Sequence, residues 1–117
     1  MVAPRVDEAI RTEKVVINTV IVMELAHFLI KNLGTIEGAE QMNVFLSFPF
    51  TIDTLDYALV LRAVELLRRY THQGVGGRDA TILATAEKLS VSKLMTHDEA
   101  FRKIEWIETI DPVAKRT

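Results

Sequence analysis

The strongest constraint on the fold is the alternation of short, β-branched apolar segments with longer helical patterns. Strands are predicted at residues 15–17, 50–52, 93–96 and 106–110, and helices at 20–33, 36–48, 55–70 and 79–89, with one helical turn at 99–103. Strands that alternate with helices are typical of a parallel sheet with right-handed crossovers. A length of 117 residues suits one domain. The sequence therefore predicts a single small α/β sandwich over residues 1–117.

Composition removes several classes of function. The chain has no cysteine, which excludes disulfides, thiolate metal sites and a cysteine nucleophile, and which fits the cytoplasm as the expected location. Fourteen basic and 16 acidic residues give a net charge of −2, so the chain as a whole does not attract nucleic acid. The most apolar window, residues 15–30, is interrupted by polar residues, so we expect a buried segment and no membrane span.

Glu24 is the most informative single residue. It lies in a helix that is apolar nearly all round, so we expect both faces of this helix to be covered. A carboxylate in such surroundings is costly unless it is paired, protonated or bound to a metal ion. The alternative is a polar stripe shared with His27, three residues further along the same helix face.

Asp79 and Asp98 are the other candidate acids. Asp79 begins one helix, and Asp98 follows the strand at 93–96, within a capping-box pattern from Thr96 to Glu99. Each acid has an ordinary explanation as a helix cap. If both lie at the carboxyl end of a parallel sheet, their repulsion favours a cation between them. Oxygen ligands suit Mg²⁺ or Mn²⁺ better than zinc, and three carboxylates would suit metal-assisted phosphodiester hydrolysis.

The segment around the glycine loop carries weaker signals. Glycines at 74, 76 and 77 lack the lysine and hydroxyl residue of a P-loop, so we interpret them as loop flexibility. Thr96 either caps a helix or contacts a phosphate oxygen or a metal-bound water. Four arginines that are close in sequence to this loop hint at a phosphate-binding rim, although outward arginines are usually only solvated. They are Arg62, Arg68, Arg69 and Arg78.

Three segments together resemble the PIN-domain family and, among its members, the VapC-type toxins. They are residues 15–25 (VVINTVIVMEL), 76–86 (GGRDATILATA) and 96–101 (THDEAF). The resemblance covers about residues 10–113 and implies a three-layer α/β/α sandwich with a mostly parallel sheet. It also implies a Mg²⁺- or Mn²⁺-dependent ribonuclease whose metal ligands are Asp79, Asp98 and Glu24, with Thr96 and Arg78 near the substrate.

The chain departs from this family at its N-terminal end. The family's first strand and first acid precede the helix acid by some tens of residues, whereas only 23 residues precede Glu24, and Asp7 does not match. That strand sits at the centre of the family's sheet, so the strands at 15–17 and 93–96 would lose a shared neighbour. Three explanations compete: a fragment or misassigned start of a longer protein, a gap filled by a second copy or a partner, or a rearranged sheet.

The resemblance thus implies an endoribonuclease, with RNA as its substrate and the toxin of a toxin–antitoxin pair as its biological setting. It also implies a homodimer and a small antitoxin protein as partner. The alternative is a non-catalytic PIN remnant that acts through protein–protein contact, which the missing first acid favours. A third possibility is an α/β binding module without a metal, for which Glu24 would be hydrogen-bonded far from Asp79.

Overall fold

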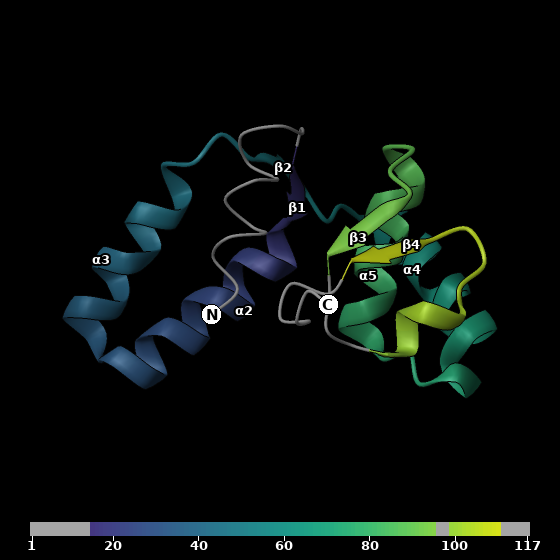
Figure 1. The fold of residues 1–117 in the computed structure, drawn as a ribbon, viewed down its shortest axis with the longest axis horizontal. Helices are drawn as coiled ribbons and strands as arrows, with labels where there is room; N and C mark the ends of the chain where they lie inside the picture. Colours follow the sequence, from purple (N-terminus) through teal and green to yellow (C-terminus); the bar gives the residue numbers. More distant parts are fainter. Residues whose placement is uncertain (1–14, 96–98, 111–117) are drawn as a thin grey trace, which may run out of the picture.

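The computed structural model describes residues 15–95 and 99–110. Its strands are β1 (Val16–Asn18), β2 (Thr51–Asp53), β3 (Lys93–Met95) and β4 (Glu108–Ile110). Its helices are α2 (Thr19–Leu33), α3 (Thr35–Leu46), α4 (Tyr57–Tyr70) and α5 (Gly77–Lys88), with 3₁₀ turns η1 (Thr71–Gln73) and η2 (Glu99–Lys103). The predicted order of strands and helices is confirmed, with boundaries shifted by one or two residues (Figure 1).

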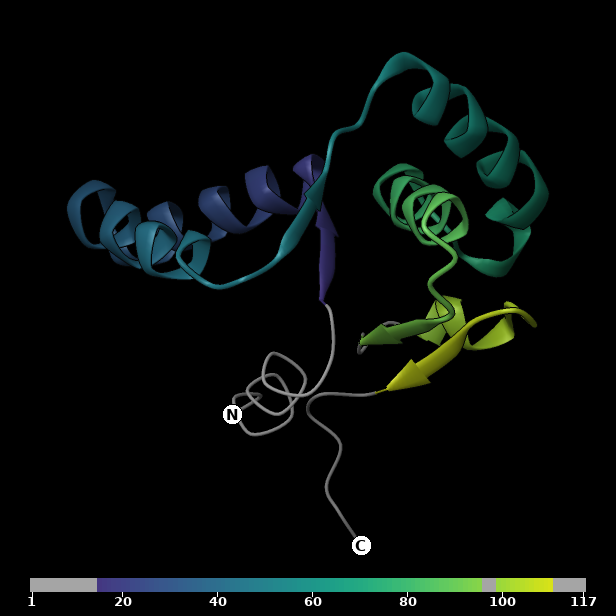
Figure 2. The same cartoon turned by 90° about the horizontal axis from the view of Figure 1, so that it is seen from above.

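The strands pair in parallel, as predicted, but they form two separate sheets. In the described part of the chain β1 pairs with β2, where Ile17 lies opposite Ile52, and β3 pairs with β4, where Leu94 lies opposite Thr109. Figure 2 shows these two half-sheets standing apart. Within the described residues β1 and β3 each pair on one side; the expectation that they have lost a shared neighbour stays a prediction, because residues 1–14 lie outside the described part of the chain.

The hydrophobic core lies in the C-terminal half of the chain, between α4, α5 and η2. Helix α4 buries Leu59, Ala63, Leu66 and Tyr70, whose spacing forms one apolar stripe. The stripe belongs to a larger cluster: Val75, Ala80, Leu83, Ala84, Ala86, Phe101, Ile104 and Ile107 are also buried in it. This core fixes the position of α5, the helix that carries Asp79.

Helices α2 and α3 form an arm that extends away from this core (Figures 1 and 2). Gly34 has a φ of +87° and separates the two helices. The helices come so close that a Cβ on Gly38 would lie 2.6 Å from Ile30 Cα. The main tertiary neighbours of α2 are α3 and β1.

The expectation that both faces of the helix at 20–33 are covered is wrong. Helix α2 contains no buried residue, and Met23 and Phe28 are among its exposed side chains. The apolar sequence predicted burial, but α2 packs mainly against one other helix, which leaves much of its surface accessible to solvent. Among the described residues, no helix is long and apolar enough to cross a membrane.

Candidate metal centre

Asp79 is a buried acid at the start of α5. Its residue surface is 7% exposed, and its Oδ2 accepts a hydrogen bond from the Gly76 N–H at 3.2 Å. This bond caps the helix, as one of the two interpretations predicted. Its other oxygen, Oδ1, is buried and has no hydrogen-bond partner among the described residues. A buried carboxylate oxygen without a donor is costly, so the cap alone does not explain this side chain.

Arg78 brings Glu24 and Asp79 to one place. Its Nη2 lies 3.6 Å from Asp79 Oδ1, and its Nη1 lies 3.9 Å from Glu24 Oε2. Glu24 comes from α2 and Asp79 from α5, so two acids that are far apart in sequence share one cation. Both Glu24 and Arg78 have side chains that are more than half exposed, so their ion pair is solvated and weak.

The environment of Glu24 therefore differs from the expectation. Its carboxylate is exposed and is not enclosed by apolar side chains, and His27 is exposed as well. Burial does not make Glu24 a candidate; its ion pair with Arg78, which also contacts the buried Asp79, does. The third possibility had Glu24 buried and hydrogen-bonded; in the structure Glu24 is exposed and forms an ion pair with Arg78.

Asn18 connects the elements that carry the two acids. It is fully buried, its Nδ2 donates to Thr85 Oγ1 at 3.1 Å, and its Oδ1 accepts from the Ile21 N–H at 2.9 Å. The first bond joins the end of β1 to α5, and the second caps α2. No local sequence pattern predicts the bond to α5, because 67 positions separate its partners.

Asp98 and Thr96 lie outside the described residues, so their roles stay predictions. In the part of the chain that the structure describes, no three histidines or acids form a metal-binding group. Of the three candidate acids, Glu24 and Asp79 are the two that the structure describes.

This pair fits a divalent cation. Both ligands are carboxylates, the oxygen donors that Mg²⁺ and Mn²⁺ prefer. Asp79 Oδ1 has no hydrogen-bond partner, and its charge is met by the Arg78 guanidinium at 3.6 Å.

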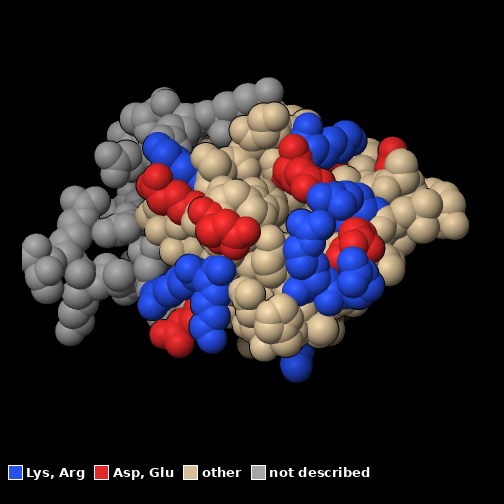
Figure 3. Space-filling view, turned by 90° about the vertical axis from the view of Figure 1, so that its right-hand side faces the viewer, with Lys and Arg blue, Asp and Glu red and all other residues tan. Residues whose placement is uncertain are grey.

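The arginine rim expected around the glycine loop is largely bound to acids. Arg62 pairs with Glu87, Arg68 with Glu65, and Arg78 with the two candidate acids. The hydrogen bond from Arg62 lowers the pKa of Glu87, and the hydrogen bond from Arg68 lowers the pKa of Glu65. Figure 3 shows basic and acidic side chains interspersed on one face of the molecule, without a continuous basic surface. Of these arginines, Arg78 alone is placed at the candidate site.

The architecture, the order of the elements and the acid pair all agree with one family. The sequence model of the PIN-domain family matches residues 2–107 of this chain. The chain belongs to the PIN-domain family. Neither a curated protein nor a solved structure matches it.

PIN domains are a family of nucleases that generally depend on divalent metal ions and act on RNA. Membership agrees with the α/β architecture, whose parallel strands and flanking helices the structure describes. In the part of this PIN domain that the structure describes, the strands form two separate pairs, and Arg78 contacts one carboxylate of α2 and one of α5.

Proposed function

We propose that this PIN domain is a metal-dependent endoribonuclease that hydrolyses RNA phosphodiester bonds. The observation that supports this function best is the convergence of Glu24 and Asp79 on Arg78, together with the lack of a hydrogen-bond donor to the buried Asp79 Oδ1. A capping acid alone would not need a second carboxylate beside it.

Asp79 and Glu24 are the proposed ligands of Mg²⁺ or Mn²⁺, and Asp98 is the proposed third ligand. When bound, such an ion lowers the pKa of a water molecule and so generates a nucleophile for in-line attack on a phosphodiester. The protein contributes fixed geometry: the Gly76 N–H holds one oxygen of Asp79, which leaves the other for the ion.

Arg78 and Thr96 are the proposed substrate contacts. The Arg78 guanidinium is more than half exposed and lies at the carboxylate pair, where the phosphate of an RNA strand would approach. Its planar fork suits two phosphate oxygens. The five N–H donors of this side chain would be able to contact a phosphate oxygen as well as the acids.

Cleavage of a mixed RNA pool tests this function. We expect cutting with Mn²⁺ that stops with EDTA and falls at least about 100-fold in Asp79→Asn, since catalysis that depends on metal ligation requires the carboxylate. Asparagine keeps an oxygen for the Gly76 N–H, so the helix cap survives this substitution. Glu40→Gln, at an exposed acid on α3, is the matched control. Metal-dependent cutting that Asp79→Asn retains would overturn the proposal.

Exposed apolar side chains on the arm support a second candidate function, protein–protein contact. Met23, Phe28, Ile36 and Val44 are all more than half exposed. A surface of this kind marks interaction sites. A small antitoxin or a second copy would cover it, in a PIN domain that either retains or has lost ribonuclease activity.

Mass measurement in solution distinguishes these cases. For a homodimer through the arm, Ile36→Glu gives a monomer while Tyr57→Glu, at an exposed residue on α4, leaves the dimer intact. A stable complex with a small partner and no cleavage of RNA with any metal ion would favour the non-catalytic function. A monomer in the parent chain would exclude the homodimer.

A further inference from the structure

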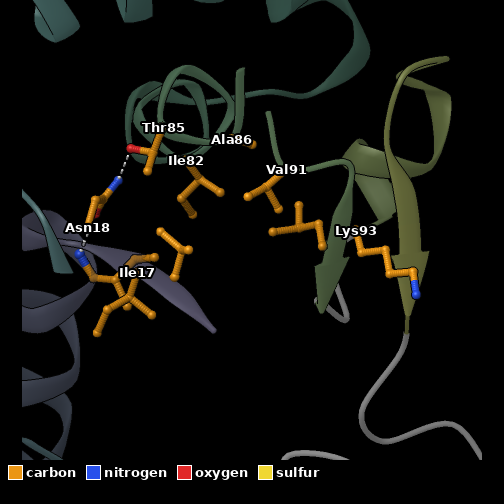
Figure 4. A pocket seen from close by; sticks show the side chains of 10 residues that line it. Ile17, Asn18, Ile82, Thr85, Ala86, Val91 and Lys93 are labelled. Atoms are coloured by element: carbon orange, nitrogen blue, oxygen red, sulfur yellow. Dashed lines mark hydrogen bonds between the residues drawn. The ribbon is translucent and has the colours of Figure 1, made fainter. Parts of the chain in front are cut away.

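Asn18 lies where β1 ends and α2 begins, and its buried side chain bonds to two helices at once. Its Oδ1 accepts a hydrogen bond from the Ile21 N–H in the first turn of α2. Its Nδ2 donates to Thr85 Oγ1 at 3.1 Å on α5, as Figure 4 shows, and to Thr81 Oγ1 at 3.4 Å on the same helix. One amide group thus joins the start of α2 to the middle of α5.

The two threonine hydroxyls determine which way round the Asn18 amide lies. Thr85 Oγ1 donates to Thr81 O at 2.9 Å, and Thr81 Oγ1 donates to Arg78 O at 2.7 Å. A hydroxyl has one proton, so both oxygens are left as acceptors for the two N–H groups of Asn18. Serine, threonine and aspartate also cap helices, but none of them is able to donate twice. The cap alone would therefore not require asparagine at this position.

Both acids of the candidate metal centre lie close to this network along their own helices. Glu24 follows Asn18 by six positions in the numbering, roughly 9 Å along the axis of α2. On α5, Asp79 precedes Thr81 by two positions. The hydrogen bonds also end on the main chain of Arg78, whose guanidinium contacts both acids. A shift of Asn18 against α5 would therefore move one acid relative to the other.

The ion pair between α2 and α5 is too weak to hold this arrangement by itself. Helix α2 has no buried residue, and its main neighbours are β1 and α3, which belongs to the same arm. Glu24 and Arg78 are 3.9 Å apart and more than half exposed, and such a pair contributes little. The Asn18 amide is fully buried, and breaking its bonds would leave polar groups without partners. The amide is therefore the stronger of the two links.

We propose that Asn18 is a positioning residue: through Thr81 and Thr85 it holds α2 against α5, so that Glu24 and Asp79 meet at one cation. Asn18 itself touches neither the ion nor the substrate. The effect on metal affinity rests on the proposed function, in which the two acids are metal ligands. The position of α2 on α5 does not rest on it, because this position can be measured without any metal ion.

Two substitutions break the network and keep the cap of α2. Asn18→Ser retains a capping hydroxyl but lacks the amide, and Thr85→Val removes the hydroxyl that accepts from Asn18. We expect each to weaken Mn²⁺ binding about tenfold in titration calorimetry, as does the loss of a group that orients metal ligands. Thr85→Ser keeps the hydroxyl and should bind like the parent. Leu66→Val, in the buried core of α4, controls for lost stability alone and should also bind like the parent.

Spin labels measure the position of α2 in the metal-free chain. The sequence has no cysteine, so His27→Cys on α2 and Arg69→Cys on α4 introduce two unique labelling sites, both at exposed positions. Helix α4 packs on α5, so the distance between the labels reports how the arm lies on the core. We expect one narrow distance distribution in the parent and in Thr85→Ser, and a broader or displaced one in Asn18→Ser and Thr85→Val.

The two readouts separate failure of the positioning role from failure of the metal site. Unchanged distances in Asn18→Ser and Thr85→Val overturn the positioning role, and so does an equal change in Leu66→Val. Parent-like Mn²⁺ affinity in variants whose distances have changed overturns it as well. A parent chain that binds no Mn²⁺ overturns the metal-dependent function alone; changed distances in Asn18→Ser and Thr85→Val would then still support Asn18 as the residue that positions α2.

Discussion

The Nη1 atom of Arg78 lies 3.9 Å from Glu24 Oε2, and this ion pair connects the exposed arm helix α2 to the start of α5. Because the Nη2 atom of the same guanidinium lies 3.6 Å from Asp79 Oδ1, the positive charge occupies the space between two acids. A divalent cation held by those acids would compete with it.

Removal of this guanidinium should therefore strengthen metal binding. For Arg78→Ala we expect Mn²⁺ affinity to rise by about two- to fivefold, the equivalent of an exposed ion pair of ~0.5–1 kcal/mol. Calorimetric titration measures it. Arg68→Ala, which breaks an ion pair with Glu65 on α4, is the control and should leave the affinity unchanged. Equal or weaker Mn²⁺ binding by Arg78→Ala would show that Arg78 does not compete with the ion.

Gly38 should be intolerant of any side chain. A Cβ there would lie 2.6 Å from Ile30 Cα and 2.8 Å from Leu29 O, so α2 and α3 would have to separate. We expect Gly38→Ala to lower the free energy of unfolding by about 1–3 kcal/mol. Gly77→Ala is the control, because open space surrounds that position, and it should be neutral or slightly stabilising. Urea denaturation of both variants checks this, and equal stabilities would mean that the helices are not closely packed.

Asn18 should matter for stability and for the site. Asn18→Ala removes the cap of α2 and the bond to Thr85, and it leaves a buried threonine hydroxyl with one partner fewer. We expect a loss of about 2–3 kcal/mol in the free energy of unfolding. Asn32→Ala, at an exposed position whose side chain donates to Phe28 O, should cost less than about 0.5 kcal/mol. Similar losses in the two variants would argue against Asn18 as the link between β1 and α5.

Acid should weaken the contact between α4 and α5. The hydrogen bond from Arg62 holds the pKa of Glu87 below its ordinary value of 4.5. A depressed carboxyl pKa stabilises the fold above the unfolded-state pKa, and this contribution is lost as the pH falls through the folded-state value. The pair is partly exposed, so we expect at most about 1 kcal/mol. Denaturation between pH 7 and pH 3 should show that the parent loses this increment while Glu87→Gln does not. Parallel pH profiles would contradict it.

The sequence predicted the fold well where the signal was local. The four strands and the four helices follow from short-range patterns, and the structure confirms them. The exposure of α2 was not predictable in this way, because an apolar helix looks the same in sequence whether a neighbour covers it or not. Asp79 at the helix start was identifiable from its spacing. The lack of a hydrogen-bond partner for its buried Oδ1 depends on tertiary packing.

The convergence of the acids was also beyond local patterns. The sequence put Glu24 and Asp79 on separate helices, 55 positions apart by their numbering. Their meeting depends on β1 lying against α5, a contact fixed by the buried side chain of Asn18. Arg78 was predicted to lie near the substrate, and that stays a prediction; its contacts with both acids depend on the tertiary structure.

Mn²⁺ binding to the folded chain tests the central claim most directly, namely that Glu24 and Asp79 are metal ligands. Titration calorimetry should be carried out on the parent chain, on Asp79→Asn and on the control Glu40→Gln. We predict that Asp79→Asn weakens Mn²⁺ binding at least about tenfold, because it removes the charge of a ligand, and that Glu40→Gln binds like the parent. Parent-like Mn²⁺ affinity in a folded Asp79→Asn variant would contradict the claim.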